Sequence, residues 1–298
     1  MHLSQCFRVA FAAALMVLAS VAAQADSHPK FDAIYVFGDS YNDVGNLYAA
    51  SGNTYPPAPY YNGRFSNGPL WVEHVAGTYG LPMTPSLAGG TDYAFAGAQV
   101  LASVPFGTGS IPSVPQQVEL YLSQHKGKAD PNALYIVEGG GNDILDATGG
   151  SPTTLGVEVG FRLLATICLL ERSGARFLFV PRLFDVGLVP EAQILGTSAF
   201  DSAATAALNK TLDEGLRFQS FSRETRLYRI DTFALLQAVV KDGTHYGFTD
   251  VTDPCLNTFV SPATLCSNPY ANYFWDGVHP TIFGHSFFAV LAEQELNH

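Results

Sequence analysis

Apolar residues along this chain occur as short runs of strand length and as longer stretches with helical periodicity. The short runs are rich in Val, Ile, Leu, Phe and Tyr, so we expect strands at residues 33–37, 92–95, 133–137, 176–180 and 227–230. The longer stretches predict helices at residues 69–79, 115–124, 154–173, 200–220, 232–241 and 283–296. Strands that alternate with helices form βαβ units. Such units predict a three-layer α/β/α sandwich around a central parallel sheet.

Two long segments interrupt this alternation. Residues 49–68 are rich in Tyr, Pro, Asn and Gly, and residues 243–273 are rich in Thr, Asp, Asn and Pro. Loops of this length usually serve a function or are disordered. We expect both to form walls of a site, although the first is equally compatible with surface decoration. The aromatic residues in and beside the first segment either line a groove for an acyl chain or sugar or pack on the core; they are Tyr55, Tyr60, Tyr61, Phe65 and Trp71.

The N-terminal residues 1–25 have the pattern of a secretory signal. Arg8 precedes an apolar run at residues 9–23, and Ala23-Gln24-Ala25 fits the small-residue rule for cleavage. A membrane anchor is the alternative, but the run is short and rich in Ala. We therefore expect an exported protein, secreted or periplasmic, whose mature residues 26–298 form a single domain without a transmembrane segment.

Charge limits the partners that we expect, and the cysteines and histidines indicate whether a disulfide or a metal site is present. The formal net charge is −11, which argues against nucleic acid and against anionic membrane surfaces. Cys255 and Cys266 lie close together in a polar segment, so an exported chain is expected to join them in a disulfide, with two free thiols as the alternative. Cys168 lies in an apolar run and is expected to be a buried free thiol. The histidines form no H-E-x-x-H motif, so no metal is expected.

A serine follows the first predicted strand directly, in the run Gly38-Asp39-Ser40. The carboxyl end of a buried strand lies at the functional edge of a parallel sheet, and a glycine lets the backbone turn sharply there. Ser40 is therefore a candidate nucleophile. Asp39 or Ser40 could equally cap the helix that follows.

Near the other end of the chain, Asp276 and His279 are three residues apart. A carboxylate at this spacing can accept a hydrogen bond from one imidazole nitrogen, which leaves the other nitrogen free to take a proton from a hydroxyl. A serine nucleophile needs such a base. The alternative is a capping aspartate beside a surface histidine.

Glycine-rich segments follow two further predicted strands. The run from Gly139 to Gly141 precedes Asn142, whose amide N–H could donate to a developing oxyanion, and Gly97 follows the strand at 92–95 as a possible second donor. A glycine-rich loop could instead bind a phosphate. The chain has no G-x-G-x-x-G and no G-K-[ST], so a nucleotide cofactor is unsupported and no cofactor is expected.

Taken in their order along the chain, four blocks of residues resemble the GDSL esterase/lipase family, also called SGNH hydrolases. The blocks are residues 37–46, Gly97, residues 140–143 and residues 276–280. Residues 63–68 with Trp71 resemble the subgroup of bacterial lipases, haemolysin-like phospholipases, acyltransferases and plant GDSL enzymes.

The resemblance implies a flavodoxin-like strand order and a secreted carboxylic ester hydrolase. It makes Ser40 the nucleophile, His279 the base and Asp276 the residue that orients it, and it assigns the oxyanion hole to Ser40, Gly97 and Asn142. The substrate would be a lipid, a short-chain ester or an acetylated sugar. An acyltransferase, a phospholipase and a carbohydrate acetylesterase would use the same residues, and a non-catalytic binding module would not need them all.

Two positions depart from the family pattern. Tyr41 stands where the motif has Leu, and Ala96 stands where relatives often have a second Gly. Neither position supplies a proton or a donor in the expected mechanism. The chain also lacks the G-x-S-x-G motif, which argues against an ordinary α/β-hydrolase elbow.

Overall fold

A four-stranded parallel sheet forms the centre of the protein, which we describe from a computed structural model over residues 30–298. The predicted signal sequence at residues 1–25 lies outside the described residues. The strands, in their spatial order, are β1 (Ile34–Phe37), β4 (Leu134–Val137), β5 (Phe177–Phe179) and β6 (Arg226–Tyr228). All neighbouring pairs are parallel, which confirms the predicted sheet.

The segment predicted as a strand at residues 92–95 is irregular but lies beside β1. Val36 donates to Thr91 and Tyr93 donates to Val36, so one bridge of a parallel ladder forms there. The ladder does not continue, because the Gly38 N–H donates to Gln117 Oε1 at 2.8 Å instead of to the Tyr93 carbonyl oxygen. Asn46 donates to the carbonyl oxygens of Asp92 and Ala94. Counting this segment, the spatial order matches the expected flavodoxin-like topology.

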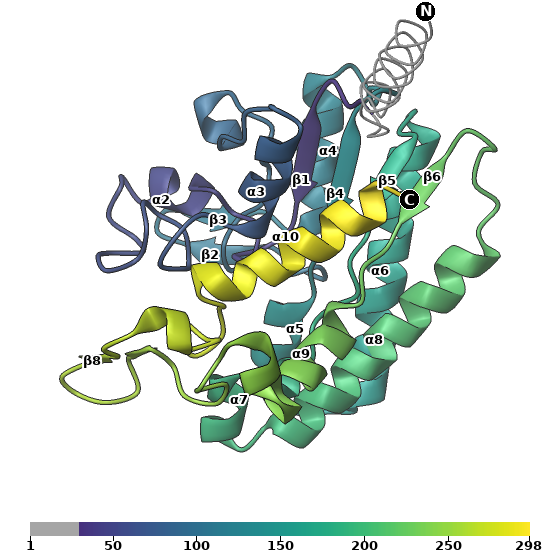
Figure 1. Ribbon diagram of the computed structural model, residues 1–298. Helices are drawn as coiled ribbons and strands as arrows, with labels where there is room; N and C mark the ends of the chain where they lie inside the picture. Colours follow the sequence, from purple (N-terminus) through teal and green to yellow (C-terminus); the bar gives the residue numbers. More distant parts are fainter. Residues whose placement is uncertain (1–29) are drawn as a thin grey trace, which may run out of the picture.

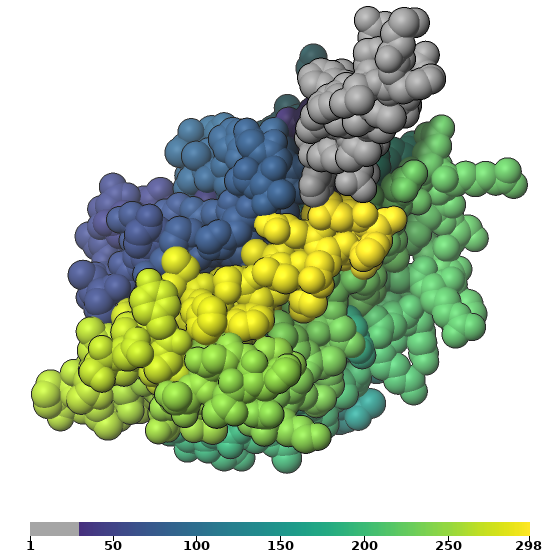
Figure 2. Space-filling view, in the orientation of Figure 1, coloured from purple at the N-terminus to yellow at the C-terminus, as the bar shows by residue number. Residues whose placement is uncertain are grey.

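All six predicted helices are present, with slightly different ends. They are α3 (Trp71–Thr78), α4 (Val114–Gln124), α6 (Pro152–Arg172), α8 (Ser198–Phe218), α9 (Thr232–Lys241) and α10 (Ile282–Leu296). In Figure 1, α10 crosses in front of the sheet beside α3, whereas α4 and α6 lie behind it. Figure 2 shows the C-terminal residues lying directly against the first third of the described chain. The three layers are therefore as predicted.

Two glycines let α6 and α8 pack closely. A Cβ on Gly156 would lie 2.1 Å from the Ala204 carbonyl oxygen, and one on Gly160 would lie 3.0 Å from that of Leu208. Among residues 30–298, α6 is also the one helix long and apolar enough to span a membrane, with a mean hydropathy of 1.6. Its best window is 44% buried inside the protein, and core helices can pass the same test of length and composition.

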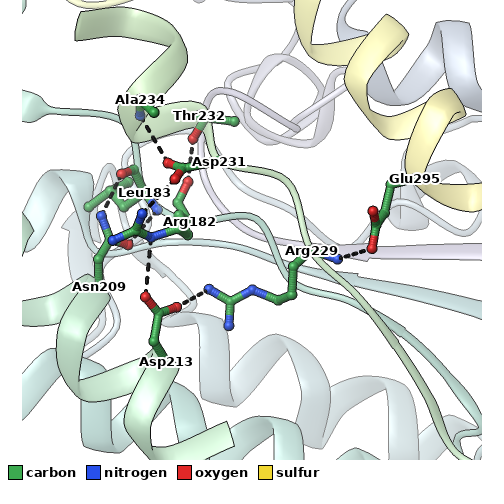
Figure 3. Close-up of polar contacts among 9 residues, drawn as sticks. All are labelled: Arg182, Leu183, Asn209, Asp213, Arg229, Asp231, Thr232, Ala234 and Glu295. Carbon is green, nitrogen blue, oxygen red and sulfur yellow. Dashed lines mark hydrogen bonds and ion pairs between the residues drawn. The ribbon is translucent and has the colours of Figure 1, made fainter. Parts of the chain in front are cut away.

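A polar network joins the carboxyl ends of β5 and β6 to the helices beside them (Figure 3). Arg182, beyond β5, pairs with Asp231 at 2.6 Å and lies 3.3 Å from Asp213 on α8. Asp213 also pairs with Arg229 at 2.6 Å, and Asp231 caps α9 by accepting the Ala234 N–H. Partly exposed ion pairs of this kind contribute little stability individually, so we assign the network to orienting the strand ends.

Several short elements are too brief for their sequence periodicity to predict. The short helices are α2 (Asn46–Ala50), α5 (Gly141–Leu145) and α7 (Pro190–Leu195). The 3-10 helices are η1 (Ser86–Ala88), η2 (Val186–Leu188), η3 (Gly243–Tyr246) and η4 (Pro269–Ala271). Two antiparallel hairpins pair β2 (Val104–Phe106) with β3 (Gly109–Ile111), and β7 (Leu256–Asn257) with β8 (Thr264–Leu265). Most of these elements lie in the loops around the strand ends.

Candidate active site

Ser40, His279 and Asp276 form one hydrogen-bonded chain, although Ser40 lies far from the other two in the sequence. His279 Nε2 lies 2.7 Å from Ser40 Oγ, and His279 Nδ1 lies 2.8 Å from each carboxylate oxygen of Asp276. Ser40 follows β1, and the other two share a tight turn before α10. All three side chains are buried. The structure thus brings together the three residues that the sequence singles out for nucleophilic chemistry.

The turn from Asp276 to His279 is held by its own carboxylate. Asp276 Oδ1 accepts the backbone N–H groups of Val278 and His279 at 2.9 and 2.8 Å. Burial alone would raise the pKa of Asp276, but the charge of His279 and the hydrogen bonds from His279 and Tyr60 lower that pKa below its usual value. The carboxylate is therefore ionised and able to orient the imidazole.

Three candidate oxyanion donors lie on the same cavity as the triad. Ser40, Gly97 and Asn142 all line it, together with His279. Among residues 30–298, no acceptor takes the backbone N–H of Ser40 or of Gly97. Gly97 has φ +81, a conformation that favours glycine. The donors predicted from the sequence are thus together and available.

Asp43 anchors the segment that carries Gly97. Its carboxylate accepts the backbone N–H of Ala96 at 2.8 Å and that of Gly45 at 2.7 Å, and it also binds the first turn of α2. The segment around Gly97 is therefore attached to the helix that follows the nucleophile. The sequence identifies Asp43 only as part of a family block, whereas the structure gives its physical role.

A buried polar cluster supports the nucleophile turn from below. Asn42 donates to Glu138 at 2.7 Å and accepts from the indole of Trp71 at 2.9 Å. Burial raises the pKa of Glu138 well above its usual value, and Asp39 adds to that shift. Burial also raises the pKa of Asp39 to about 6, although the Tyr41 backbone N–H and His279 oppose the shift. These carboxyl groups lie behind the site rather than in its cavity.

Tyr41 connects the nucleophile turn to the turn that carries the base. Its phenol donates to the Val278 carbonyl oxygen at 2.8 Å, and its ring stacks on Phe184 at 4.3 Å between centroids. A leucine at this position would lack the hydroxyl. The departure from the family motif at position 41 therefore adds a direct bond between the two catalytic segments.

A cavity of about 460 Å³ opens beside Ser40 and His279. Its volume lies within the range of small-molecule sites. The walls are largely apolar and include Leu47, Tyr55, Phe65, Val104, Phe106 and Ile111. The β2–β3 hairpin supplies three of these side chains, so an element that the sequence does not predict forms one wall.

The loop at residues 243–273 contains a disulfide that packs on the residue before Asp276. Cys255 and Cys266 are joined, with their Cα atoms 4.7 Å apart, as expected from the sequence. Both pack with Trp275, directly before Asp276, and Leu256 donates to the Trp275 carbonyl oxygen at 2.6 Å. Cys168 is a buried free thiol, as predicted.

The sequence indicates Tyr60 only as one of five aromatic residues for a groove wall or the core, whereas the structure places it against the triad. The phenol of Tyr60 donates to Asp276 Oδ2 at 2.7 Å. Within residues 30–298 we find no group of three or more His, Cys, Asp or Glu side chains that could hold a metal ion.

A family model described as GDSL-like lipase/acylhydrolase matches residues 34–291. The chain belongs to this family. Membership confirms the resemblance seen in the four sequence blocks and, at the level of the family, the prediction of an ester hydrolase.

Individual relatives are distant. The chain is 26% identical to the thermolabile hemolysin of Vibrio parahaemolyticus over 279 residues. This match covers 87% of this chain and 62% of the hemolysin. It is 28% identical to the phosphatidylcholine-sterol acyltransferase of Aeromonas hydrophila, over 82% of this chain and 71% of that protein. It is also 28% identical to a GDSL esterase/lipase of Arabidopsis thaliana, in a match that covers 83% of this chain and 82% of that protein. The chain thus spans less than two thirds of the hemolysin.

Proposed function

We propose that this chain hydrolyses carboxylic esters through an acyl-enzyme on Ser40. Ser40 Oγ attacks the ester carbonyl carbon while His279 Nε2 takes the hydroxyl proton and Asp276 orients the imidazole. The backbone N–H groups of Ser40 and Gly97 and the side-chain amide of Asn142 donate to the tetrahedral oxyanion. His279 then gives its proton to the leaving alcohol. Water hydrolyses the acyl-enzyme by the same route in reverse.

This proposal depends on one observation. A continuous chain of hydrogen bonds runs from Ser40 Oγ through His279 to Asp276, beside a cavity that Ser40 and His279 line. A non-catalytic binding module has no need for these distances. An organophosphonate should label Ser40 in the wild-type chain, and Ser40→Ala should lower kcat at least about 10³-fold without changing the circular dichroism spectrum. An unlabelled wild-type chain, or an active Ser40→Ala variant, rejects the proposal.

We further propose that the preferred substrates carry an apolar acyl chain rather than an acetyl group. The β2–β3 hairpin places Val104, Phe106 and Ile111 on the cavity wall beside the proposed oxyanion hole. Each methylene buried there contributes about 0.8 kcal/mol, so kcat/KM should rise from the acetate to the butyrate and octanoate esters of p-nitrophenol. Ile111→Trp should lower turnover of octanoate more than that of acetate. A preference for acetate, or for acetylated xylan, contradicts this assignment.

The proposed acyl-enzyme also permits transfer to an alcohol. Similarity to a protein named a phosphatidylcholine-sterol acyltransferase favours testing this reaction. Rising concentrations of a sterol or a simple alcohol should divert acyl groups from the free acid to a new ester. Product analysis that finds only free acid excludes transfer to these acceptors.

We also propose that residues 1–25 direct export and are removed, and that residues 26–298 form one hydrolase domain in the extracellular or periplasmic space. The Cys255–Cys266 disulfide supports an oxidising compartment. Intact mass measurement of protein recovered outside the cytoplasm should give a chain beginning at Asp26. A retained N-terminal segment contradicts cleavage.

A further inference from the structure

The carboxylate of Asp276 has partners beyond the imidazole. Its Oδ1 accepts two backbone N–H groups from its own turn, those of Val278 and His279. Its Oδ2 lies 2.8 Å from His279 Nδ1 and 2.7 Å from the phenol of Tyr60. Within the described part of the chain, Tyr60 is the one donor other than His279 that reaches Oδ2.

Tyr60 comes from a different loop than the turn it binds. Its ring packs edge-on against Trp275, with 6.1 Å between centroids, and lies 5.5 Å from Phe65. Phe65 lines the substrate cavity and lies 5.1 Å from the His279 ring. Tyr60 is thus restrained by rings on two sides, and its hydroxyl connects the cavity wall to Asp276.

We propose that Tyr60 is a positioning residue that fixes the rotation of the Asp276 carboxylate and, through it, the imidazole of His279. The inference rests on the proposed function, since it assigns Tyr60 a part in the same triad. The backbone donors bind only Oδ1 and not Oδ2. With these bonds alone, the carboxylate plane could still turn about its bond to Cβ. A donor on Oδ2 removes this freedom, because both oxygens are then held by groups outside the imidazole.

The charge state of the phenol agrees with this role. Burial and the adjacent Asp276 carboxylate raise the pKa of Tyr60 above its ordinary value. The phenol therefore keeps its proton and donates it at any pH where an ester hydrolase works. A hydrogen bond to an ionised group is stronger than one between neutral groups.

Tyr60→Phe tests the proposal, because it removes the hydroxyl and keeps the ring against Trp275 and Phe65. We expect kcat for p-nitrophenyl butyrate to fall about tenfold, since a hydrogen bond to a charged group typically contributes at least that factor, with KM unchanged. The acidic limb of the pH profile of kcat/KM should move to higher pH. Without the phenol, the Asp276 carboxylate accepts one hydrogen bond fewer and stabilises a neighbouring positive charge more strongly.

The neighbouring Tyr61→Phe is the matched control. Tyr61 is an exposed residue of the same loop that does not line the cavity beside Ser40, and its ring faces the Arg64 guanidinium. Tyr61→Phe also removes one hydroxyl, but it should leave both kcat and the pH profile unchanged. Active-site titration with an organophosphonate counts the folded sites, so kcat is expressed per titrated site for each variant.

Several results overturn the proposal. They are an unchanged kcat and acidic limb in Tyr60→Phe, a rise in KM alone, an equal loss in Tyr61→Phe, and an unfolded Tyr60→Phe protein, which would assign the hydroxyl to the fold. Failure of the proposed function is a separate result. An active Ser40→Ala variant rejects the triad itself, whereas a labelled wild-type Ser40 with a normal Tyr60→Phe variant rejects only the role of Tyr60.

Discussion

The side-chain nitrogen of Asn142 donates a hydrogen bond to the carbonyl oxygen of Ala98 over 2.9 Å. An amide nitrogen carries two protons, so this bond orients the group and leaves the second proton for the cavity that Asn142 lines. Ala98 follows Gly97 directly. The contact therefore fixes two proposed oxyanion donors relative to each other before a substrate binds.

Asn142→Ala should lower kcat by about 10²–10³-fold, the usual effect of losing one oxyanion donor. KM should change much less, because the missing bond strengthens only as charge develops on the carbonyl oxygen. Steady-state kinetics with p-nitrophenyl butyrate measure this. Asn132→Ala, outside the site, serves as the control. Wild-type kcat in Asn142→Ala removes that side chain from the oxyanion hole.

Gly97→Ala should lower kcat through the backbone. The new Cβ would lie 3.1 Å from Ile111 Cδ1 in a residue with φ +81, so both crowding and backbone strain would displace the Gly97 N–H. Gly89→Ala is a close control, because Gly89 has φ +82 and no atom within 4 Å of the added Cβ. It should cost about 1 kcal/mol of stability and leave kcat unchanged. Equal kinetic effects in both variants contradict a role for the Gly97 backbone.

Replacing both Cys255 and Cys266 with Ser should lower stability and activity together. Closing a loop of this sequence separation, 11 residues, restricts the unfolded chain and by the chain-entropy model contributes about 3 kcal/mol. The cysteines pack on Trp275 next to the triad, so loosening this loop should also disturb Asp276. Urea unfolding and kcat of the variant measure the two effects, and Cys168→Ser is the control. Full activity in the double variant separates the disulfide from the site.

Asp39→Asn should change how stability depends on pH. The pKa of Asp39 is raised in the folded state from 3.8 to about 6, so the folded protein holds this proton more firmly than the unfolded chain does. The Asp39 contribution to the free energy of unfolding therefore falls as pH rises from about 4 to about 6. The variant does not lose this free energy. Its free energy of unfolding should therefore rise relative to that of the wild type over that pH range, by about 3 kcal/mol at most. The comparison is made by urea unfolding at several pH values, with the exposed Asp32→Asn as control. A difference that does not vary with pH contradicts the shifted pKa.

Much of this site could be predicted because each key residue follows an apolar run. Ser40 comes after β1, Asn142 lies just beyond β4, and Gly97 follows the segment beside β1, so the rule for parallel sheets places them at one edge. The spacing of Asp276 and His279 allows them to pair, and the family resemblance favours this over a capping aspartate beside a surface histidine. The sheet and its six long helices are confirmed for the same reason, since their periodicity extends over enough residues to be recognised.

Other parts could not be predicted from local patterns. Tyr60 is one of five aromatic residues in and beside a loop without periodicity, and its partner lies 216 residues away in the sequence. The β2–β3 hairpin has a proline in one strand and Gly-Ser in the other, so no apolar run marks it in the sequence. The segment at 92–95 has strand composition, but the Gly38 N–H donates to Gln117 rather than to this segment, so only one bridge with β1 forms.

The separation of 239 residues between Ser40 and His279 has a consequence for the life of the protein. The proposed nucleophile is synthesised early and its proposed base late, directly before α10, which packs beside α3 in the folded protein. On the proposed mechanism, a chain emerging from the ribosome therefore carries a serine that cannot yet attack an ester. The proposed activity arises only when nearly the whole domain has folded, which would protect the cell that makes the chain.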